Sequence, residues 1–330
     1  MSLHPAFRAY LDELNPLIEA NARAGVEATP ESARAALAGL NQFALPVVEI
    51  DEIFDTAVTY GPEATDGADG SAAASMPGPV RVPVRVYVPR PGVPSDVIAF
   101  VHGGGHMAGD LEVYDFSARR VAAATGMVVV SVDYRRSPEA PFPAGLTDTY
   151  QAVRHLTEVL VGVATTEQVY AVADSGGAAK VASIAMRTTA GDWSSPISRQ
   201  VLLYPSLDYT LSGPSVDDLG TGYFLEADRV RWYFDHYFAA DDDREGASPL
   251  SGPFGPGMPE TLVIAAEYDP LISEAELYVE RMVAAGASAR LIVAPGMIHA
   301  FAFFETKVPE MAARLYEVIA EFLRTGDARW

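Results

Sequence analysis

Ser175 lies in the segment ADSGG, residues 173–177, directly after an apolar run, and these surroundings could make it a nucleophile. In the nucleophile elbow G-x-S-x-G, the residues two before and two after the serine pack together in a strained turn between a strand and a helix. Here Ala173 stands at the first glycine position and adds one methyl group to the crowded point. The pattern is therefore weakened but not broken, and an ordinary serine in a glycine-containing loop is the alternative interpretation.

A glycine run, HGGG at residues 102–105, follows a second apolar stretch. Successive glycines leave their backbone N–H groups unshielded, as a site for an oxyanion requires. Residues 103–108 also satisfy the dinucleotide pattern G-x-G-x-x-A, with Asp133 at the end of the next apolar run as a ribose-binding acid. Against a nucleotide site, residues 109–110 interrupt the chain before a helix can begin, and Asp133 falls later than the expected separation of about 20 residues.

Asp269 and His299 each follow an apolar run of strand length. Both residues therefore stand where strands should end, and they come after Ser175 in the order Ser, Asp, His. This is the order found in α/β hydrolases, in which the acid orients the histidine and the histidine activates the serine. Two further acids, Asp208 and Glu267, are alternative partners for the histidine.

The elements that must position these residues alternate between apolar runs and helical patterns from about residue 80 onward. Several runs are continuously apolar, as strands buried on both faces are. We therefore predict an α/β fold with a mostly parallel central sheet and helices on both faces. Strands are predicted at residues 80–88, 97–101, 127–134, 168–173, 199–205, 261–267 and 289–294. Helices are predicted at residues 117–125, 146–160, 178–188, 273–285 and 309–323.

Three segments depart from this alternation. Residues 61–79 are rich in Gly, Ala, Ser and Asp and are expected to form an exposed loop between two early strands. The N-terminal region to about residue 45 has apolar residues on one helical face, and residues 206–253 contain an aromatic stripe at helical spacing. We expect these last two segments to be helical additions laid over the sheet, where they could supply the apolar wall of a ligand pocket.

Composition excludes several classes of protein. The chain has 330 residues, of which 49% are hydrophobic, and no stretch approaches the about 18 apolar residues of a membrane span. The N-terminus lacks the pattern of a signal peptide, so a soluble cytoplasmic protein is expected. The absence of cysteine excludes thiolate catalysis, and no histidine spacing such as H-E-x-x-H predicts a metal. A net charge of −21 would repel nucleic acid and anionic membranes, so neither is an expected partner.

Together the motifs resemble the hormone-sensitive-lipase-like (family IV) carboxylesterases of the α/β-hydrolase superfamily, over nearly the whole chain. The matching stretches are HGGG at 102–105, VDYRRSPEAPFPA at 132–144, DSGG at 174–177, GYFL at 222–225, SPL at 248–250, YDPLISEAE at 268–276 and GMIHAF at 296–301. The departures are Ala173, the sequence Gly-Gly-Ala-Ala after the serine where the family tends to Ala-Gly-Gly-Asn, and His106 where an aromatic or aliphatic residue usually follows HGGG.

The resemblance implies two-step acyl transfer without a cofactor. Ser175 would attack the carbonyl carbon of a small acyl ester, His299 would take its proton, and Asp269 would orient the imidazole. His102 would have a structural role in the glycine loop. The oxyanion would be bound by the backbone N–H groups of three glycines, Gly104, Gly105 and Gly176.

The resemblance also implies a helical cap over the active site. The corresponding division is 1–45 for the N-terminal part of the cap, 46–205 for the first part of the catalytic core, 206–253 for the cap insertion and 254–330 for the second part of the core. Candidate substrate-binding residues are His106, Met107, Tyr204, Tyr209, Tyr223 and Phe224. Because a capped pocket is bounded, we expect activity to rise with acyl length and then fall. The resemblance suggests an optimum between about two and eight carbons.

Several alternatives remain open at this level. A deacetylase or an amidase of a small metabolite could use the same triad. A ligand-binding relative without catalysis is disfavoured because such receptors have lost the histidine, and the glycine loop leaves a NAD-dependent oxidoreductase as a further interpretation. The acidic charge should disfavour anionic esters unless a local basic residue, such as Arg135 or Arg136, overrides it. The oligomeric state is open, with a homodimer among the options.

Overall fold

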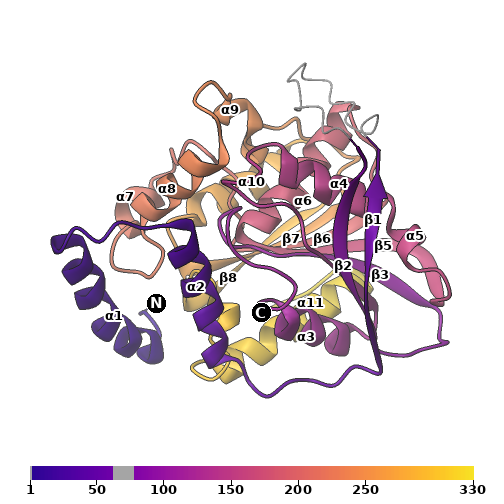
Figure 1. The fold of residues 1–330 in the computed structure, drawn as a ribbon, viewed down its shortest axis with the longest axis horizontal. Helices are drawn as coiled ribbons and strands as arrows, with labels where there is room; N and C mark the ends of the chain where they lie inside the picture. The colour runs from indigo at the N-terminus through magenta and orange to yellow at the C-terminus, as the bar shows by residue number, and fades with distance from the viewer. Residues whose placement is uncertain (1, 62–77) are drawn as a thin grey trace.

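The computed structural model describes residues 2–61 and 78–330, and within them eight strands pair in one sheet (Figure 1). Their order across the sheet is β1-β2-β4-β3-β5-β6-β7-β8. β2 pairs antiparallel with both β1 and β4, whereas the neighbours from β4 to β8 all pair in parallel. The strands are β1 (Glu52–Tyr60), β2 (Val80–Val88), β3 (Ser95–Val101), β4 (Val128–Val132), β5 (Thr165–Asp174), β6 (Ile197–Leu203), β7 (Glu260–Tyr268) and β8 (Ala289–Ile298).

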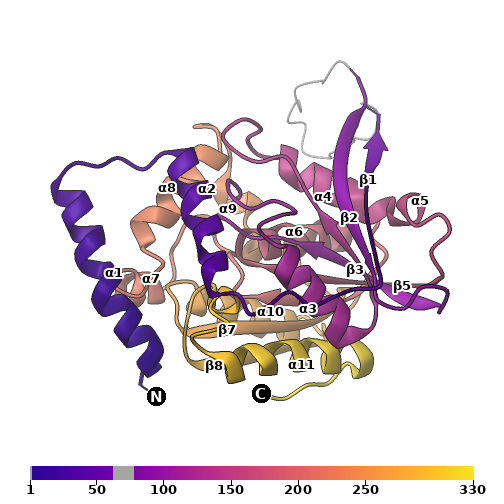
Figure 2. The ribbon, with the colours of Figure 1, turned by 60° about the horizontal axis from the view of Figure 1, so that its bottom comes forward.

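Helices cover both faces of this sheet (Figure 2). The longer ones are α1 (Pro5–Arg23), α2 (Pro30–Gly39), α3 (Asp115–Thr125), α4 (Ala144–Arg154), α6 (Ser175–Ala190), α8 (Ala227–Tyr237), α10 (Ile272–Ala284) and α11 (Pro309–Thr325). The short ones are α5 (Leu156–Val159), α7 (Ser215–Leu219) and α9 (Arg244–Ala247), with single 3₁₀ turns at η1 (Leu40–Phe43), η3 (Pro249–Ser251) and η4 (Phe301–Phe303). Among the described residues no helix is long and apolar enough to cross a membrane.

β4 shows why the central strands are apolar throughout. Val128 and Val130 pack into the core that contains α4, α6 and α10, whereas Val129, between them, packs into the core that contains α3 and α11. Because successive side chains of a strand point to opposite faces, a sheet covered on both faces requires an unbroken apolar run. α6 and α11 each run two residues beyond the predicted ends at 188 and 323, and they end where Gly191 and Gly326 adopt the left-handed conformation.

Two helical segments lie beside one another at one end of the sheet. Figures 1 and 2 both show α1 and α2 next to α7 and α8. Phe7 of α1 is fully buried, and its ring lies 5.4 Å from that of Phe304, while Asn15 Nδ2 donates to the Gly222 carbonyl at 3.0 Å. The first contact ties α1 to the core of the protein, and the second ties it to the 206–253 segment.

The predicted α/β fold is confirmed, and so are all seven predicted strands, with their ends shifted by a few residues. The single helix predicted over 146–160 is wrong in its extent. The backbone leaves the helical conformation at His155, which separates α4 from α5 and turns Leu156 into the core. The predicted loop at residues 61–79 lies between β1 and β2, and most of it falls outside the described residues.

Candidate active site

Ser175 lies at a direct junction between a strand and a helix. β5 ends at Asp174 and α6 begins at Ser175, so no loop residue separates them. The φ of Ser175, 47°, lies in the left-handed region, which is strained for a residue with a side chain. Gly177 makes the sharp turn possible, since a Cβ there would collide with the backbone carbonyls of Val101 and His102. The alanine that replaces the first glycine of the elbow lies inside β5 and is fully buried, so its methyl group is accommodated within the strand.

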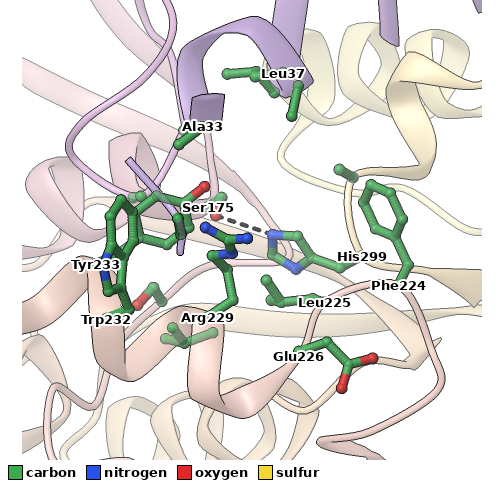
Figure 3. Close-up of a pocket in the computed structure, with 18 of the residues that line it drawn as sticks. Ala33, Leu37, Ser175, Phe224, Leu225, Glu226, Arg229, Trp232, Tyr233 and His299 are labelled. Atoms are coloured by element: carbon green, nitrogen blue, oxygen red, sulfur yellow. Dashed lines mark hydrogen bonds between the residues drawn. The ribbon is translucent and has the colours of Figure 1, made fainter. Parts of the chain in front are cut away.

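A chain of hydrogen bonds links the three residues that the sequence singled out. Ser175 Oγ lies 3.0 Å from His299 Nε2, drawn as the dashed line in Figure 3, and His299 Nδ1 lies 2.7 Å from Asp269 Oδ2. The other carboxylate oxygen of Asp269 accepts from the Leu271 amide at 3.0 Å, which fixes its orientation. Asp269 follows β7 and His299 follows β8, so the sheet itself brings the acid and the histidine to the serine after β5.

The two alternative acids are engaged elsewhere. Asp208 accepts hydrogen bonds from the hydroxyls and amides of Thr210 and Ser212. Glu267 accepts from the amide of Gly296 at 2.7 Å. These contacts hold both carboxylates in loop structure, whereas the carboxylate of Asp269 is bonded to the histidine.

The glycine loop after β3 lies against the start of α6. Gly104 and Gly105 both have positive φ, of 100° and 60°. The Gly105 nitrogen lies 3.4 Å from the point where a Cβ on Gly176 would sit, so the two backbones are in contact beside Ser175. A Cβ on Gly105 would come within 2.6 Å of the Tyr233 ring, which leaves room only for glycine. The three glycines predicted to bind an oxyanion are therefore brought together next to the serine.

Hydrogen bonds to Asp174 hold the glycine loop in place. The Asp174 carboxylate accepts from the Gly103 amide at 2.7 Å and from the Tyr114 hydroxyl at 3.0 Å, while burial raises its pKa to about 6. His102 stacks on Tyr134 with ring centroids 4.4 Å apart, and burial lowers its pKa to about 3, so the imidazole is neutral. Sequence reasoning assigned a structural role to the histidine but missed Asp174, although its position next to the nucleophile was a usable signal.

His106 and Lys180 form a second buried pair behind the loop. His106 has a φ of 63°, and its Nδ1 lies 2.7 Å from Lys180 Nζ. The imidazole stacks on Tyr237 of α8, with centroids 3.9 Å apart and nearly parallel planes. Burial holds the pKa of Lys180 well below its usual range and likewise lowers the pKa of His106. Burial therefore disfavours the charged form of both partners in this hydrogen bond.

A cavity of about 700 Å³ opens over Ser175 and His299 (Figure 3). This size suits a small organic ligand. Its walls come from α1, α2, the loop at residues 224–226 and α8. Most wall residues are apolar or aromatic: Leu14, Ile18, Ala33, Leu37, Phe224, Leu225, Val230, Trp232, Tyr233 and Phe234. The aromatic stripe recognised in the sequence thus forms one side of this cavity.

Only two of the six candidate substrate-binding residues line the cavity, namely His106 and Phe224. The other four do not, for reasons of packing. Tyr204 lies behind His299, with the two rings 4.9 Å apart, and Met107 is fully buried. Tyr209 packs edge-on to Phe234 at 5.1 Å, and Tyr223 packs on Tyr268 at 5.3 Å. Conversely, Trp232, Tyr233 and Arg229 line the cavity although they had not been proposed as pocket residues.

Two other kinds of site find no support in the geometry. A dinucleotide loop should lead directly into a helix, but α3 begins only at Asp115, well after the glycine run. Within residues 2–61 and 78–330, no group of three or more His, Cys, Asp or Glu residues is placed to hold a metal ion.

The topology and the elbow define an α/β hydrolase, and comparison with known proteins places the chain more closely. The sequence model of a family described as having the α/β hydrolase fold matches residues 98–303. An ethyl acetate hydrolase of Pseudomonas putida is 31% identical over 314 residues, which cover 91% of this chain and 92% of that one. Carboxylesterase NlhH of Mycobacterium tuberculosis is 32% identical over 248 residues, 71% of this chain and 76% of that one. The hyperthermophilic esterase of Pyrobaculum calidifontis has 30% identity and a TM-score of 0.81 over 99% of both chains.

The chain therefore belongs to the α/β-hydrolase family, and within it to the hormone-sensitive-lipase-like carboxylic ester hydrolases.

Proposed function

We propose that this enzyme hydrolyses short- to medium-chain acyl esters through an acyl-enzyme formed on Ser175. The observation that carries the proposal is the continuous hydrogen-bond chain from Ser175 Oγ through His299 to Asp269, at the base of a largely apolar cavity. A serine hydroxyl is a weak nucleophile alone and needs an adjacent base to attack a carbonyl carbon.

In the first half-reaction, Ser175 Oγ bonds to the ester carbonyl carbon while its proton passes to His299 Nε2. Asp269 stabilises the resulting imidazolium through the Nδ1–H bond, without taking the proton itself. The carbonyl oxygen becomes an oxyanion beside Gly105 and Gly176, whose backbones are in contact. Each such preorganised donor typically contributes about 2.7–4 kcal/mol to transition-state stabilisation.

Collapse of this intermediate breaks the bond to the leaving alcohol, which takes its proton from His299. In the second half-reaction the same histidine accepts a proton from water, and the resulting hydroxide attacks the acyl carbon. Ser175 then leaves with the proton, and the carboxylic acid is released. The buried Asp174 keeps the oxyanion loop in place by accepting from the Gly103 amide throughout.

Substrate size follows from the walls of the cavity. We propose that α1 and α2, within residues 1–45, and residues 206–253 act as a cap over a catalytic core formed by residues 46–205 and 254–330. Each acyl methylene contributes about 0.8 kcal/mol only while apolar wall is available to bury it. Trp232 and Tyr233 limit that wall on the α8 side, and Leu37 limits it on the α2 side.

The experiment is a series of p-nitrophenyl esters from acetate to palmitate, together with emulsified triolein. We expect specific activity to peak at acyl chains of about two to eight carbons and to be poor on palmitate and triolein. Ser175→Ala should lower turnover by a factor on the order of 10⁶. Ser251→Ala, which changes an exposed serine in η3, is the matched control. Substantial activity in the Ser175 variant would refute the assignment of the nucleophile, and a preference for palmitate would refute the bounded pocket.

A further inference from the structure

Arg229 introduces a positive charge into a cavity that is otherwise mostly apolar. Among the described residues that line the cavity, it is the one arginine or lysine. Figure 3 shows its side chain rising from α8 with the guanidinium group towards the hydrogen bond between Ser175 and His299. A cation in this place is unexpected in a wall built to bury acyl groups.

No carboxylate of the described residues neutralises this guanidinium. The Arg229 group lies over the Trp232 ring, 5.2 Å from its centroid, and its Nη1 is buried without a hydrogen-bond partner. The two acidic side chains nearest in sequence also line the cavity, but each has another partner. Glu226 accepts from the Gly222 amide at 2.9 Å, and Asp228 pairs with Arg231 at 2.9 Å. Arg90 and Arg281 also lack an acidic partner among the described residues, but each of them donates to a backbone carbonyl.

The physical chemistry of this group points to an anionic partner. A buried charged donor without an acceptor is costly, and that cost is removed when an acceptor arrives. The planar guanidinium fits a carboxylate with two parallel N–H···O bonds, and the surrounding apolar wall strengthens such a pair by excluding water.

We propose, on the basis of the esterase function above, that Arg229 binds an ionised carboxylate of the substrate. The preferred substrates are then esters that carry a second, free carboxylate, such as half-esters of dicarboxylic acids. The residues suggested by the sequence for such a role are committed elsewhere. Arg135 forms bidentate contacts with Asp148 at 2.8 and 2.9 Å, and Arg136 donates to the Gly109 carbonyl.

The long-range charge of the protein does not prevent this selectivity. Exposed charges are screened over about 10 Å at 0.1 M ionic strength, whereas a contact inside the cavity is screened far less. We therefore expect the net charge to slow the arrival of an anionic ester at low salt. Arg229 would nevertheless hold that ester more tightly once it is bound.

The test compares monoethyl glutarate with ethyl 4-carbamoylbutanoate, in which a neutral primary amide of the same size replaces the free carboxylate, at pH 7.5, with release of ethanol measured for both. The readout is the ratio of kcat/KM for the anionic ester to kcat/KM for the neutral ester. We expect a ratio above one in the wild-type enzyme and a fall of about 10- to 100-fold in Arg229→Gln, as for the loss of a hydrogen bond to a charged group. The ratio for Arg229→Lys should lie between those of the wild type and Arg229→Gln, because lysine keeps the charge but cannot form two parallel N–H···O bonds.

Arg244→Gln is the matched control. This variant also removes one positive charge from residues 206–253. Neither Arg244 nor its partner Asp235 lines the cavity. An equal ratio in the wild type and in Arg229→Gln would overturn the proposal, as would an equal fall in Arg244→Gln. Absence of hydrolysis of every ester, including p-nitrophenyl butyrate, would instead refute the esterase function on which the proposal rests.

Discussion

Replacing Lys180 by methionine should change how the stability of the protein depends on pH. Lys180 is 1% exposed, and its Nζ lies 2.7 Å from His106 Nδ1 and 4.1 Å from the centre of the Tyr134 ring. Because burial holds its pKa well below the usual range, the folded protein keeps this amine neutral over a range in which the unfolded chain protonates it. Folding therefore releases a proton at this site.

The sign and size of the effect follow from proton linkage. Stability rises with pH wherever the unfolded state binds more protons, by about 1.4 kcal/mol per pH unit for one proton. This gain ends near the unfolded lysine pKa of about 10.4, and it is lost as pH falls towards the lowered pKa of the folded state. Methionine has no such dependence. The methionine variant instead loses the hydrogen bond between residue 180 and His106 Nδ1. This loss costs about 1–3 kcal/mol of stability and does not depend on pH in this range.

Between the lowered pKa of the folded state and about pH 10.4, a fall of about two pH units removes as much stability from the wild type as the lost hydrogen bond removes from the methionine variant. The assay is urea unfolding followed by circular dichroism at several values between pH 7 and pH 10. It uses the wild type, the single variants Lys180→Met and His106→Phe, and the double variant His106→Phe/Lys180→Met. The double variant should lose less than the sum of the single losses, since neither polar partner is left unpaired. Lys307→Met removes the only other lysine and is the control.

A stability difference between the wild type and Lys180→Met that stays constant from pH 7 to pH 10 would refute this reasoning. It would mean that the folded protein holds Lys180 protonated, with a charge that water or an acid reaches.

Two predictions concern catalysis. Asp269→Asn should lower turnover about 10⁴-fold while the fold is kept, because His299 loses the carboxylate that orients it; an equal loss in Asp208→Asn would show that the acid is misassigned. Gly105→Ala should lower kcat/KM because its methyl group would lie 2.6 Å from the Tyr233 ring, and adding Tyr233→Leu should recover part of the loss. If the second change recovers nothing, strain at the positive φ of residue 105 is the cause rather than the contact with the ring.

The triad was predictable because the information that places it is local. Each of Ser175, Asp269 and His299 directly follows a strand that can be recognised from its own apolar run, and parallel strands end at the same edge of a sheet. Chain order then suffices to bring the residues together. The glycine loop was predictable for the same reason, since it follows β3, which lies beside β5.

The wall of the cavity was much less predictable because it depends on how α8 is rotated. The aromatic residues of that helix lie on more than one of its faces. Tyr233 therefore lines the cavity, whereas Tyr237 does not line it and stacks on His106 instead. Lys180 was missed because lysine is ordinarily a surface residue, and only its neighbours in space show that it is buried. The position of Arg229 in the cavity depends on the same helix rotation.

The helix α8 therefore connects the wall of the cavity with the glycine loop. Tyr237 stacks on His106 just after the glycine loop, Tyr233 lies against Gly105 within the loop, and Arg229 reaches into the cavity. These three side chains come from fewer than three turns of one helix, so any displacement of α8 moves all of them together. The placement of this one helix therefore sets both a wall of the cavity and the packing against the glycine loop.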